Sequence, residues 1–213
     1  MRLRGAFSSP VMAGALMMLI AAQPGPAAAG GLEFSLRHEY YTVSGATPGE
    51  IFLDIRRQRR HMRSAHDVRS FSVARTSTRM RFRVRSRYRS GQCRISDLRM
   101  KLKFVVTLPR LADETRLDAE TRALWRRFLK EVMAHENEHV RIWKDCVRRL
   151  HARLSTLSAR DCKALKSRFK RAFRAGRERC RDLNTAFDEH TRQARRNEPF
   201  LRAAIAQLRQ RGK

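Results

Sequence analysis

The chain has 213 residues, with 48 Lys and Arg against 20 Asp and Glu, which gives a formal net charge of +28. A field of that size attracts polyanions such as nucleic acid, anionic lipid, acidic polysaccharide or acidic protein. The basic residues run through the whole chain rather than one tail, so we expect mostly solvated outer faces and no dedicated nucleic-acid site. After the first 29 residues no stretch is apolar enough to cross a membrane, which excludes a transmembrane helix from the rest of the chain.

Residues 1–29 have the composition of a secretory signal peptide. Arg2 and Arg4 precede an almost wholly apolar run, residues 11–22, and small residues follow it as a cleavage site. The run is too short to span a bilayer as a helix, so we expect a cleaved signal, with a retained anchor as the lesser alternative. The mature chain, residues 30–213, is then expected to form a single domain that is periplasmic or secreted.

Residues 33–108 carry the patterns of β-strands. Residues 34–43 mix polar and apolar side chains with aromatics, as a strand does. Two further strands lie within residues 68–88 and residues 93–108, and a turn at residues 89–92 joins them into a hairpin. In the first of these two strands Arg alternates with apolar residues, which predicts a half-buried strand with a guanidinium-lined outer face.

Helices are expected on both sides of this hairpin. A short helix over residues 50–60 follows Thr47, which is a suitable N-cap. Residues 113–208 are predicted to be helical. From Asp113 onward no Pro or Gly interrupts a long helical pattern, and the acids at its start suit the positive end of the helix dipole.

A turn over residues 155–161 divides the helical region in two. In the second long helix Gly176 is a weak point, and Pro199 ends or kinks it. Because the connection is short, the two long helices should be antiparallel neighbours. The predicted fold class is therefore α+β, an antiparallel sheet followed by two long packed helices.

The chain contains four cysteines and no C-x-x-C pair. In an exported protein such cysteines form disulfides, so we expect one disulfide or two. Four cysteines allow three pairings, and the sequence does not choose among them. The four residues are Cys93, Cys146, Cys162 and Cys180.

The segment HENEH, residues 135–139, gives the pattern H-E-x-x-H inside the first long helix. His135 and His139 are four apart, so both imidazoles lie on one helix face and can bind one zinc ion, while Glu136 can act as general base. The alternative is a solvated His pair. The metal interpretation is favoured because both histidines continue the apolar stripe of the helix, where buried imidazoles need partners. The stripe comprises Trp125, Phe128, Val132, Trp143, Cys146, Leu150 and Leu154.

Catalytic zinc usually takes three protein ligands, so one more is expected. Asp145 is rotated away from the metal on an unbroken helix, and we expect it to be a surface acid. Mirroring the two helices about their turn brings Cys180 nearest by register, but a disulfide is its expected fate. His190 lies on the apolar stripe of the second helix, whereas Asp188 points inward only if that helix breaks. The third ligand is left between His190 and Asp188, and a buried, hydrogen-bonded histidine is the alternative for His190.

Several of these pieces also occur together in a known family. They are YYTVSGATPGE near residue 40, a strand pair entering Cys93, VVTLPRL, and a W-x-x-F-L run before HENEHV. Their order resembles a bacterial family described as predicted secreted zinc-dependent proteases, also called domain of unknown function 922. The resemblance implies that His135 and His139 are the metal pair and that Glu136 is the catalytic acid.

A later element of that family, D-x-x-T-x-H-G, is matched only in part. Asp188 and Thr191 match its first half, but Gln193 and Ala194 stand where the family has His and Gly. If the family's His is the third metal ligand, the resemblance implies that His190 or Asp188 replaces it here, or that the active site is impaired.

These observations predict an exported metallopeptidase that uses one zinc ion to hydrolyse peptide bonds in a peptide or protein substrate. One alternative is a non-enzymatic basic envelope protein that contacts anionic surfaces or lipid and keeps a vestigial or structural metal site. Another is a hydrolase that cleaves amide bonds in cell-wall material. Metal content and the effect of Glu136→Gln distinguish an enzyme from a binding protein.

Overall fold

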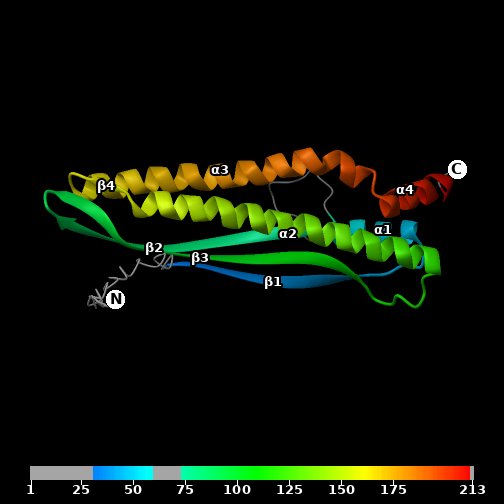
Figure 1. Ribbon diagram of the computed structural model, residues 1–213. Coiled ribbons are helices and arrows are strands. Elements are labelled where there is room, and N and C mark those ends of the chain that lie inside the picture. The colour runs from blue at the N-terminus through cyan, green and yellow to red at the C-terminus, as the bar shows by residue number, and fades with distance from the viewer. Residues whose placement is uncertain (1–30, 60–72, 212–213) are drawn as a thin grey trace, which may run out of the picture. The chain divides into compact units, whose positions relative to one another are not determined.

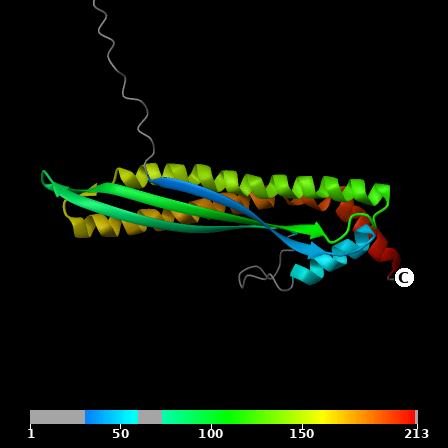
Figure 2. The same cartoon turned by 90° about the horizontal axis from the view of Figure 1, so that it is seen from below.

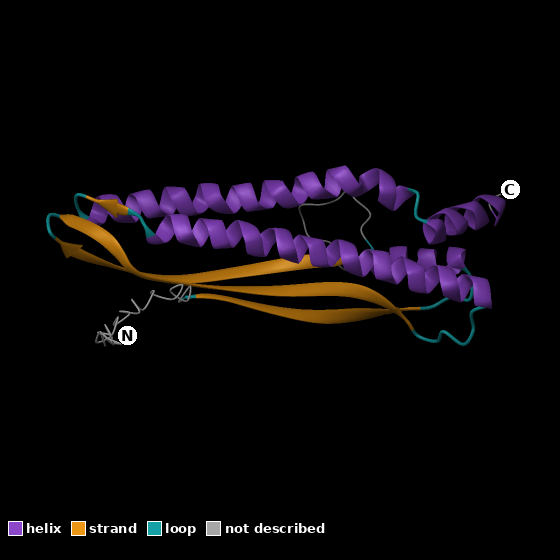
Figure 3. Ribbon diagram, in the orientation of Figure 1, coloured by secondary structure: helices purple, strands orange, loops and turns teal. Residues whose placement is uncertain are grey.

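The computed structural model describes residues 31–59 and 73–211, all within one compact unit, Gly31–Lys213. The predicted α+β class is confirmed, because two long helices cover one face of a sheet (Figures 1 and 3). The predicted signal peptide, residues 1–29, lies outside the described residues, as does the start of the strand predicted from residue 68. None of the helices in the described ranges has the length and hydropathy needed to span a bilayer.

The sheet has three long strands in the order β1-β3-β2, namely β1 (Leu32–Val43), β2 (Arg75–Arg89) and β3 (Gln92–Leu111). The predicted hairpin between β2 and β3 is confirmed, and its turn places both Ser90 and Gly91 at positive φ. The prediction of a wholly antiparallel sheet is wrong. Strand β3 lies between β2 and β1 and runs parallel to β1, so the sheet is mixed.

Alternation along β3 gives the sheet one apolar and one polar face. Its even-numbered residues from Leu98 to Leu108 are buried and belong to the core under the long helices. The residues between them point to the opposite face. Figure 2 views the sheet from that side. The strands lie in front of the second long helix (orange), and the first long helix (green to yellow) runs along their upper edge.

The first long helix, α2, spans Ala119–Ser155. It begins later than the predicted Asp113, because Asp118 is its N-cap and accepts a hydrogen bond from Thr121 N at 2.7 Å. The shorter helix α1 (Pro48–Arg59) agrees with the prediction, and Glu50 N donates to the hydroxyl of Thr47 at its start.

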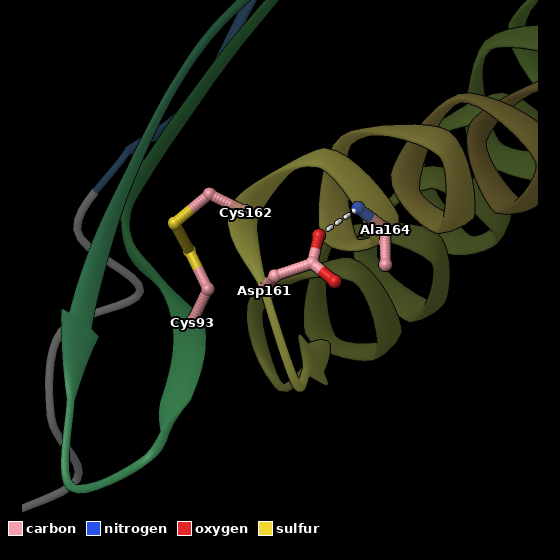
Figure 4. Close-up of a disulfide and its surroundings, with 4 residues drawn as sticks. All are labelled: Cys93, Asp161, Cys162 and Ala164. Carbon is pink, nitrogen blue, oxygen red and sulfur yellow. Dashed lines mark hydrogen bonds between the residues drawn. A yellow bond between two sulfur atoms is a disulfide. The ribbon is translucent and has the colours of Figure 1, made fainter.

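The second long helix, α3, spans Cys162–Arg196. Its N-cap is Asp161, whose carboxylate accepts a hydrogen bond from Ala164 N at 2.7 Å (Figure 4). The helix is continuous through Gly176, where an added Cβ would overlap the side chain of Leu150. Gly176 therefore allows close approach of α2 rather than weakening α3.

Beyond α3, the helix α4 (Pro199–Arg211) begins at the predicted break, with Pro199 in its first turn. Two buried clusters form the core. One joins the sheet to the C-terminal half of α2 and to α3, and the other joins α1, α4 and the N-terminal half of α2 around Trp125, Phe128 and Phe200. The segment HENEH lies on α2 between these two clusters.

Two disulfides are present, within the expectation of one or two. Cys93 at the start of β3 is bonded to Cys162 at the start of α3 (Figure 4), and Cys146 on α2 is bonded to Cys180 on α3. The connection before α3 is extended, because the two-residue strand β4 (Ser158–Ala159) pairs with the start of β3. Extended backbone rises about 3.3 Å per residue, so this segment carries α3 well beyond the end of α2 before α3 begins.

Candidate metal centre

Two histidines of α2 and one aspartate of α3 bring three donor atoms together. Nε2 of His135 lies 3.2 Å from Nε2 of His139 and 3.2 Å from Oδ1 of Asp188. The third side of the triangle, from Nε2 of His139 to the same Oδ1, is 3.4 Å. The two imidazoles are largely buried, with 12% and 11% of their side-chain surface exposed, whereas Asp188 is 45% exposed. The group therefore lies at the edge of the helix pair, open to solvent on one side.

The third residue of the group is Asp188, and the prediction that His190 points inward is wrong. His190 is exposed, and α3 is unbroken at Asp188. Mirroring about the turn would set His135 level with about residue 183, but it meets Asp188, so α3 is displaced by about five residues, or about 8 Å along the helix. The extended connection through β4 accounts for this displacement.

Asn184 orients the ring of His139. Nδ2 of Asn184 donates to the carbonyl oxygen of Cys180 at 2.8 Å, so its Oδ1 faces the imidazole. That oxygen accepts a hydrogen bond from Nδ1 of His139 at 2.9 Å. With the proton on Nδ1, the lone pair of Nε2 points to the centre of the triangle, which is the tautomer that a metal ligand needs.

The electrostatics of His139 and Asp188 favour positive charge at the centre of the triangle. Burial acts to lower the pKa of His139, but its hydrogen bonds with Asp188 and Asn184 outweigh burial and raise the pKa above its ordinary value. Burial acts to raise the pKa of Asp188, yet the hydrogen bonds from His135 and His139 hold the pKa of that carboxyl well below its usual range. Both shifts mean that positive charge is stabilised where the three side chains meet.

The donor set also fits zinc by distance and by chemistry. Tetrahedral zinc holds nitrogen and oxygen ligands at about 2.0–2.1 Å, which separates any two of them by about 3.3 Å. The observed separations are 3.2, 3.2 and 3.4 Å. Two imidazoles and one carboxylate form a common ligand set of catalytic zinc, and three protein ligands leave a fourth position open.

Neighbouring side chains of α3 enclose the triangle. The ring of Phe187 stacks on His135, with centroids 4.7 Å apart, and meets His139 edge-on. Arg195 donates to the backbone carbonyl of Asp188 at 2.9 Å, and its guanidinium lies 3.2 Å from Oδ1. This cation partly offsets the carboxylate charge, so we expect it to moderate the affinity for a metal rather than to hold one.

Glu136 points to the sheet rather than along the line of the imidazoles. Oε2 of Glu136 lies 2.6 Å from the hydroxyl of Thr76 on β2, which can also donate to the carbonyl oxygen of Glu136 at 3.2 Å. Glu136 is 5% exposed, and its neighbour Thr76 is half-buried. The Glu136 carboxylate is therefore buried against β2, with one of its oxygens engaged by the Thr76 hydroxyl.

The two other candidates from the sequence have separate roles. Asp145 binds Arg141 at 3.0 Å and Arg148 at 2.7 Å on the surface of α2, so it is a surface acid as expected. Cys180 is consumed by its disulfide, which also agrees with the prediction. That disulfide stands one helical turn from Asn184 and so ties α2 to α3 beside the triangle.

A comparison with protein families matches residues 38–195 to a bacterial protein family of unknown function, DUF922. The chain belongs to the DUF922 family. The match confirms the family suggested by the sequence resemblance. It covers the second half of β1, all of β2 and β3, the HENEH segment and the helix that carries Asp188. No match was found among curated proteins or among solved structures.

Several residues of this DUF922 site were not identified from the sequence, namely Thr76, Asn184, Phe187 and Arg195. Asn184 had a signal, since it stands midway between Cys180 and Asp188 at steps of four on one helix face. Thr76 had none, because its contact with Glu136 depends on how β2 packs under α2. Sequence spacing on one element cannot report a contact between two elements.

Proposed function

We propose that this DUF922 protein is an exported zinc-dependent metallopeptidase. The supporting observation is the near-equilateral triangle of His135, His139 and Asp188, whose edges of 3.2 to 3.4 Å match tetrahedral zinc coordination. Export is supported by the two disulfides, which persist in oxidising compartments, and by the signal-like residues 1–29.

In this proposal His135, His139 and Asp188 hold the zinc ion. When bound, zinc supplies a Lewis acid that polarises a substrate carbonyl and makes water acidic enough to attack at neutral pH. Asn184 keeps His139 in the ligating tautomer, and the stacked ring of Phe187 fixes the plane of His135. The exposed side of Asp188 leaves a route for a substrate to approach the site.

Glu136 acts as the general base and then as the general acid. It takes a proton from the attacking water and passes it to the leaving amine, so the peptide bond breaks into a carboxylate and an amine. The hydroxyl of Thr76 donates to Oε2 and restrains the orientation of the carboxylate. In the described ranges no side chain or amide donates to Oε1, so that oxygen is available to receive the proton.

A structural metal site in a non-enzymatic envelope protein is the second candidate. It is favoured by the position of the triangle between α2 and α3, where a metal would link the two helices. However, structural zinc sites usually have four protein ligands, and a fourth is missing from the group that the described residues form. The three-ligand arrangement therefore favours catalysis.

The test combines metal analysis with hydrolysis of peptide libraries and of cross-linked cell-wall peptides. Purified protein is expected to contain one zinc ion per chain and to cleave at least one peptide class. Glu136→Gln is expected to keep the zinc and lose hydrolysis by about 100-fold or more. Glu138→Gln is the matched control, since Glu138 lies on the outer side of the same turn and binds Arg141. Zinc without hydrolysis would support the structural alternative, and no zinc would refute the metal site.

A further inference from the structure

The sheet face that the helices leave uncovered carries a block of positive charge. Met80 and Phe82 pair with Leu102 and Met100 of the helix-covered face, so the residues between them on β2 and β3 point the other way. Six of these outward residues are basic and exposed, and we call them the basic sheet face. They stand in three directly opposite pairs, Arg79 with Lys103, Arg81 with Lys101, and Arg83 with Arg99.

This arrangement works against the stability of the sheet. Neighbouring strands are about 4.8 Å apart and alternate residues along a strand about 6.7 Å apart. These spacings are shorter than the Debye length of about 8 Å at physiological ionic strength, so salt does not remove the repulsion. Like charges directly opposite each other in a sheet are destabilising. The fold alone therefore does not account for three such pairs in a row.

Few acids neutralise the basic sheet face. Lys101 binds Glu33 at 2.7 Å, and Arg99 binds Asp97 at 3.3 Å. Within the described ranges, no carboxylate is in ion-pair distance of the remaining four residues, which are Arg79, Arg81, Arg83 and Lys103. Their positive charge is available to an external anion.

Protection of a sheet edge does not explain the pattern. Basic residues on an edge strand prevent pairing with another sheet, and β2 is an edge strand. However, half of the basic sheet face lies on β3, which is the central strand. The other edge strand, β1, has a mixed outward face that includes Glu33, Arg37 and Glu39. The charge follows one face of the sheet rather than its edges.

We propose that the basic sheet face docks on the phosphate surface of an anionic lipid bilayer. Guanidinium groups bind phosphate oxygens through paired hydrogen bonds, and a grid of such groups on neighbouring strands meets a planar array of phosphates. The adjoining outward positions hold Ser77, Val105 and Thr107 rather than aromatic rings on which nucleic-acid bases stack. Basic residues at an anionic surface bind additively and sensitively to salt.

Docking in this way sets the orientation of the candidate metal centre. His135, His139 and Asp188 lie on the helices, which cover the opposite face of the sheet. With the basic sheet face against lipid, the open side of Asp188 remains accessible to water. Membrane docking does not depend on the proposed hydrolysis and holds equally for a non-enzymatic protein.

The test is sedimentation of the purified protein with lipid vesicles. One set of vesicles contains phosphatidylcholine alone, and the other contains about 30% phosphatidylglycerol, which gives an anionic surface like that of natural membranes. The first variant changes Arg79, Arg81, Arg83 and Lys103 to Gln. A control variant removes the same charge from exposed helix positions, changing Arg149, Lys166, Arg171 and Arg179 to Gln. A third variant changes the three Arg of the first to Lys, which keeps the charge. Circular dichroism and disulfide content confirm that each variant is folded.

Each basic residue at an anionic surface multiplies partitioning by about five-fold, so loss of four should weaken binding to anionic vesicles by about 10- to 1,000-fold. The helix variant should change binding by less than about 10-fold, and neutral vesicles should bind none of the proteins. The Lys variant should bind anionic vesicles more weakly than wild type but more tightly than the Gln variant, because it keeps the charge and loses the paired hydrogen bonds. Equal loss in the sheet and helix variants would overturn the proposal, since net charge would suffice. Binding of wild type to double-stranded DNA but not to anionic vesicles would also overturn it.

Discussion

Replacement of Asp188 by Ala tests which residue is the third ligand of the candidate metal centre. The sequence left the choice between Asp188 and His190 open. The structure places Asp188 within 3.4 Å of both imidazoles and leaves His190 exposed. If zinc binds this group, Asp188→Ala removes the single carboxylate ligand, whereas His190→Ala removes nothing from the site. Glu189→Ala is the matched control, because it removes the same charge from the exposed neighbouring position.

The expected magnitude follows from linkage between binding and folding. Zinc at 100 times its dissociation constant stabilises the folded state by about 2.7 kcal/mol. For a chain of this size that corresponds to a rise in Tm of about 5–11 °C. Loss of a residue that only supports a ligand lowers metal affinity by up to about 100-fold. Loss of a direct ligand should therefore lower the affinity for zinc by at least that factor. At the same zinc concentration the stabilisation then falls to about 0.4 kcal/mol, or about 1–2 °C.

The assay is thermal unfolding followed by circular dichroism, with each protein measured in excess zinc and in chelator. The difference between the two Tm values is compared, so that any direct effect of a substitution on the metal-free fold cancels. We expect zinc to raise Tm by about 5–11 °C in wild type, Glu189→Ala and His190→Ala, and by only about 1–2 °C in Asp188→Ala. A full difference in Asp188→Ala, or its loss in His190→Ala, would refute the assignment of the third ligand.

Four further predictions concern the surroundings of this site and the fold that supports it. Asn184→Ala should weaken zinc by about 10- to 100-fold without removing it, because the tautomer of His139 is no longer fixed; isothermal titration that shows unchanged affinity would contradict this role. Replacing Cys146 and Cys180 by Ala removes a bond that closes a loop of 34 residues, and it should lower the free energy of unfolding in urea by about 3.8 kcal/mol. Replacing Cys93 and Cys162, whose bond closes 69 residues, should lower it by about 4.4 kcal/mol. Gly176→Ala should destabilise the fold by about 1–3 kcal/mol through overlap with Leu150. If the two side chains clash, the double variant Gly176→Ala with Leu150→Ala should lose less stability than the two single variants lose in sum. Losses that simply add would exclude a clash. Arg83→Glu places opposite charges across from Arg99 and should raise stability by about 0.2–1 kcal/mol, whereas Arg75→Glu, opposite the uncharged Thr107, should have no such effect.

The elements of this fold were largely predictable because each depends on a local pattern. The alternation of Arg and apolar residues marked β2, and the turn at Ser90 and Gly91 marked the hairpin. The pairing of β1 with β3 was not predictable, since the hairpin pattern does not state on which side of it β1 lies. The start of α2 was misplaced because Asp113 and Asp118 are both suitable N-caps, and only Asp118 reaches an amide of the helix.

The candidate metal centre was also predictable only in part. His135, Glu136 and His139 follow from spacing on a single helix. The choice between Asp188 and His190 depended on the register between two helices, and that register is set by the extended residues around β4. A helix turns by 100° per residue, so a displacement of about five residues exchanges which side chains face the partner helix. Spacing within α3 therefore could not identify the ligand.

The bond between Cys146 and Cys180 couples assembly of the three donors to the redox state of the surroundings. Before oxidation only the noncovalent packing of α2 on α3 holds Asp188 level with the imidazoles, so the three donors are less tightly fixed in a reducing compartment. After oxidation a covalent bond joins α2 to α3 one helical turn from Asn184. If the proposed hydrolysis and export are right, the site would be less firmly assembled inside the cell that makes the protein and would become fully competent after export.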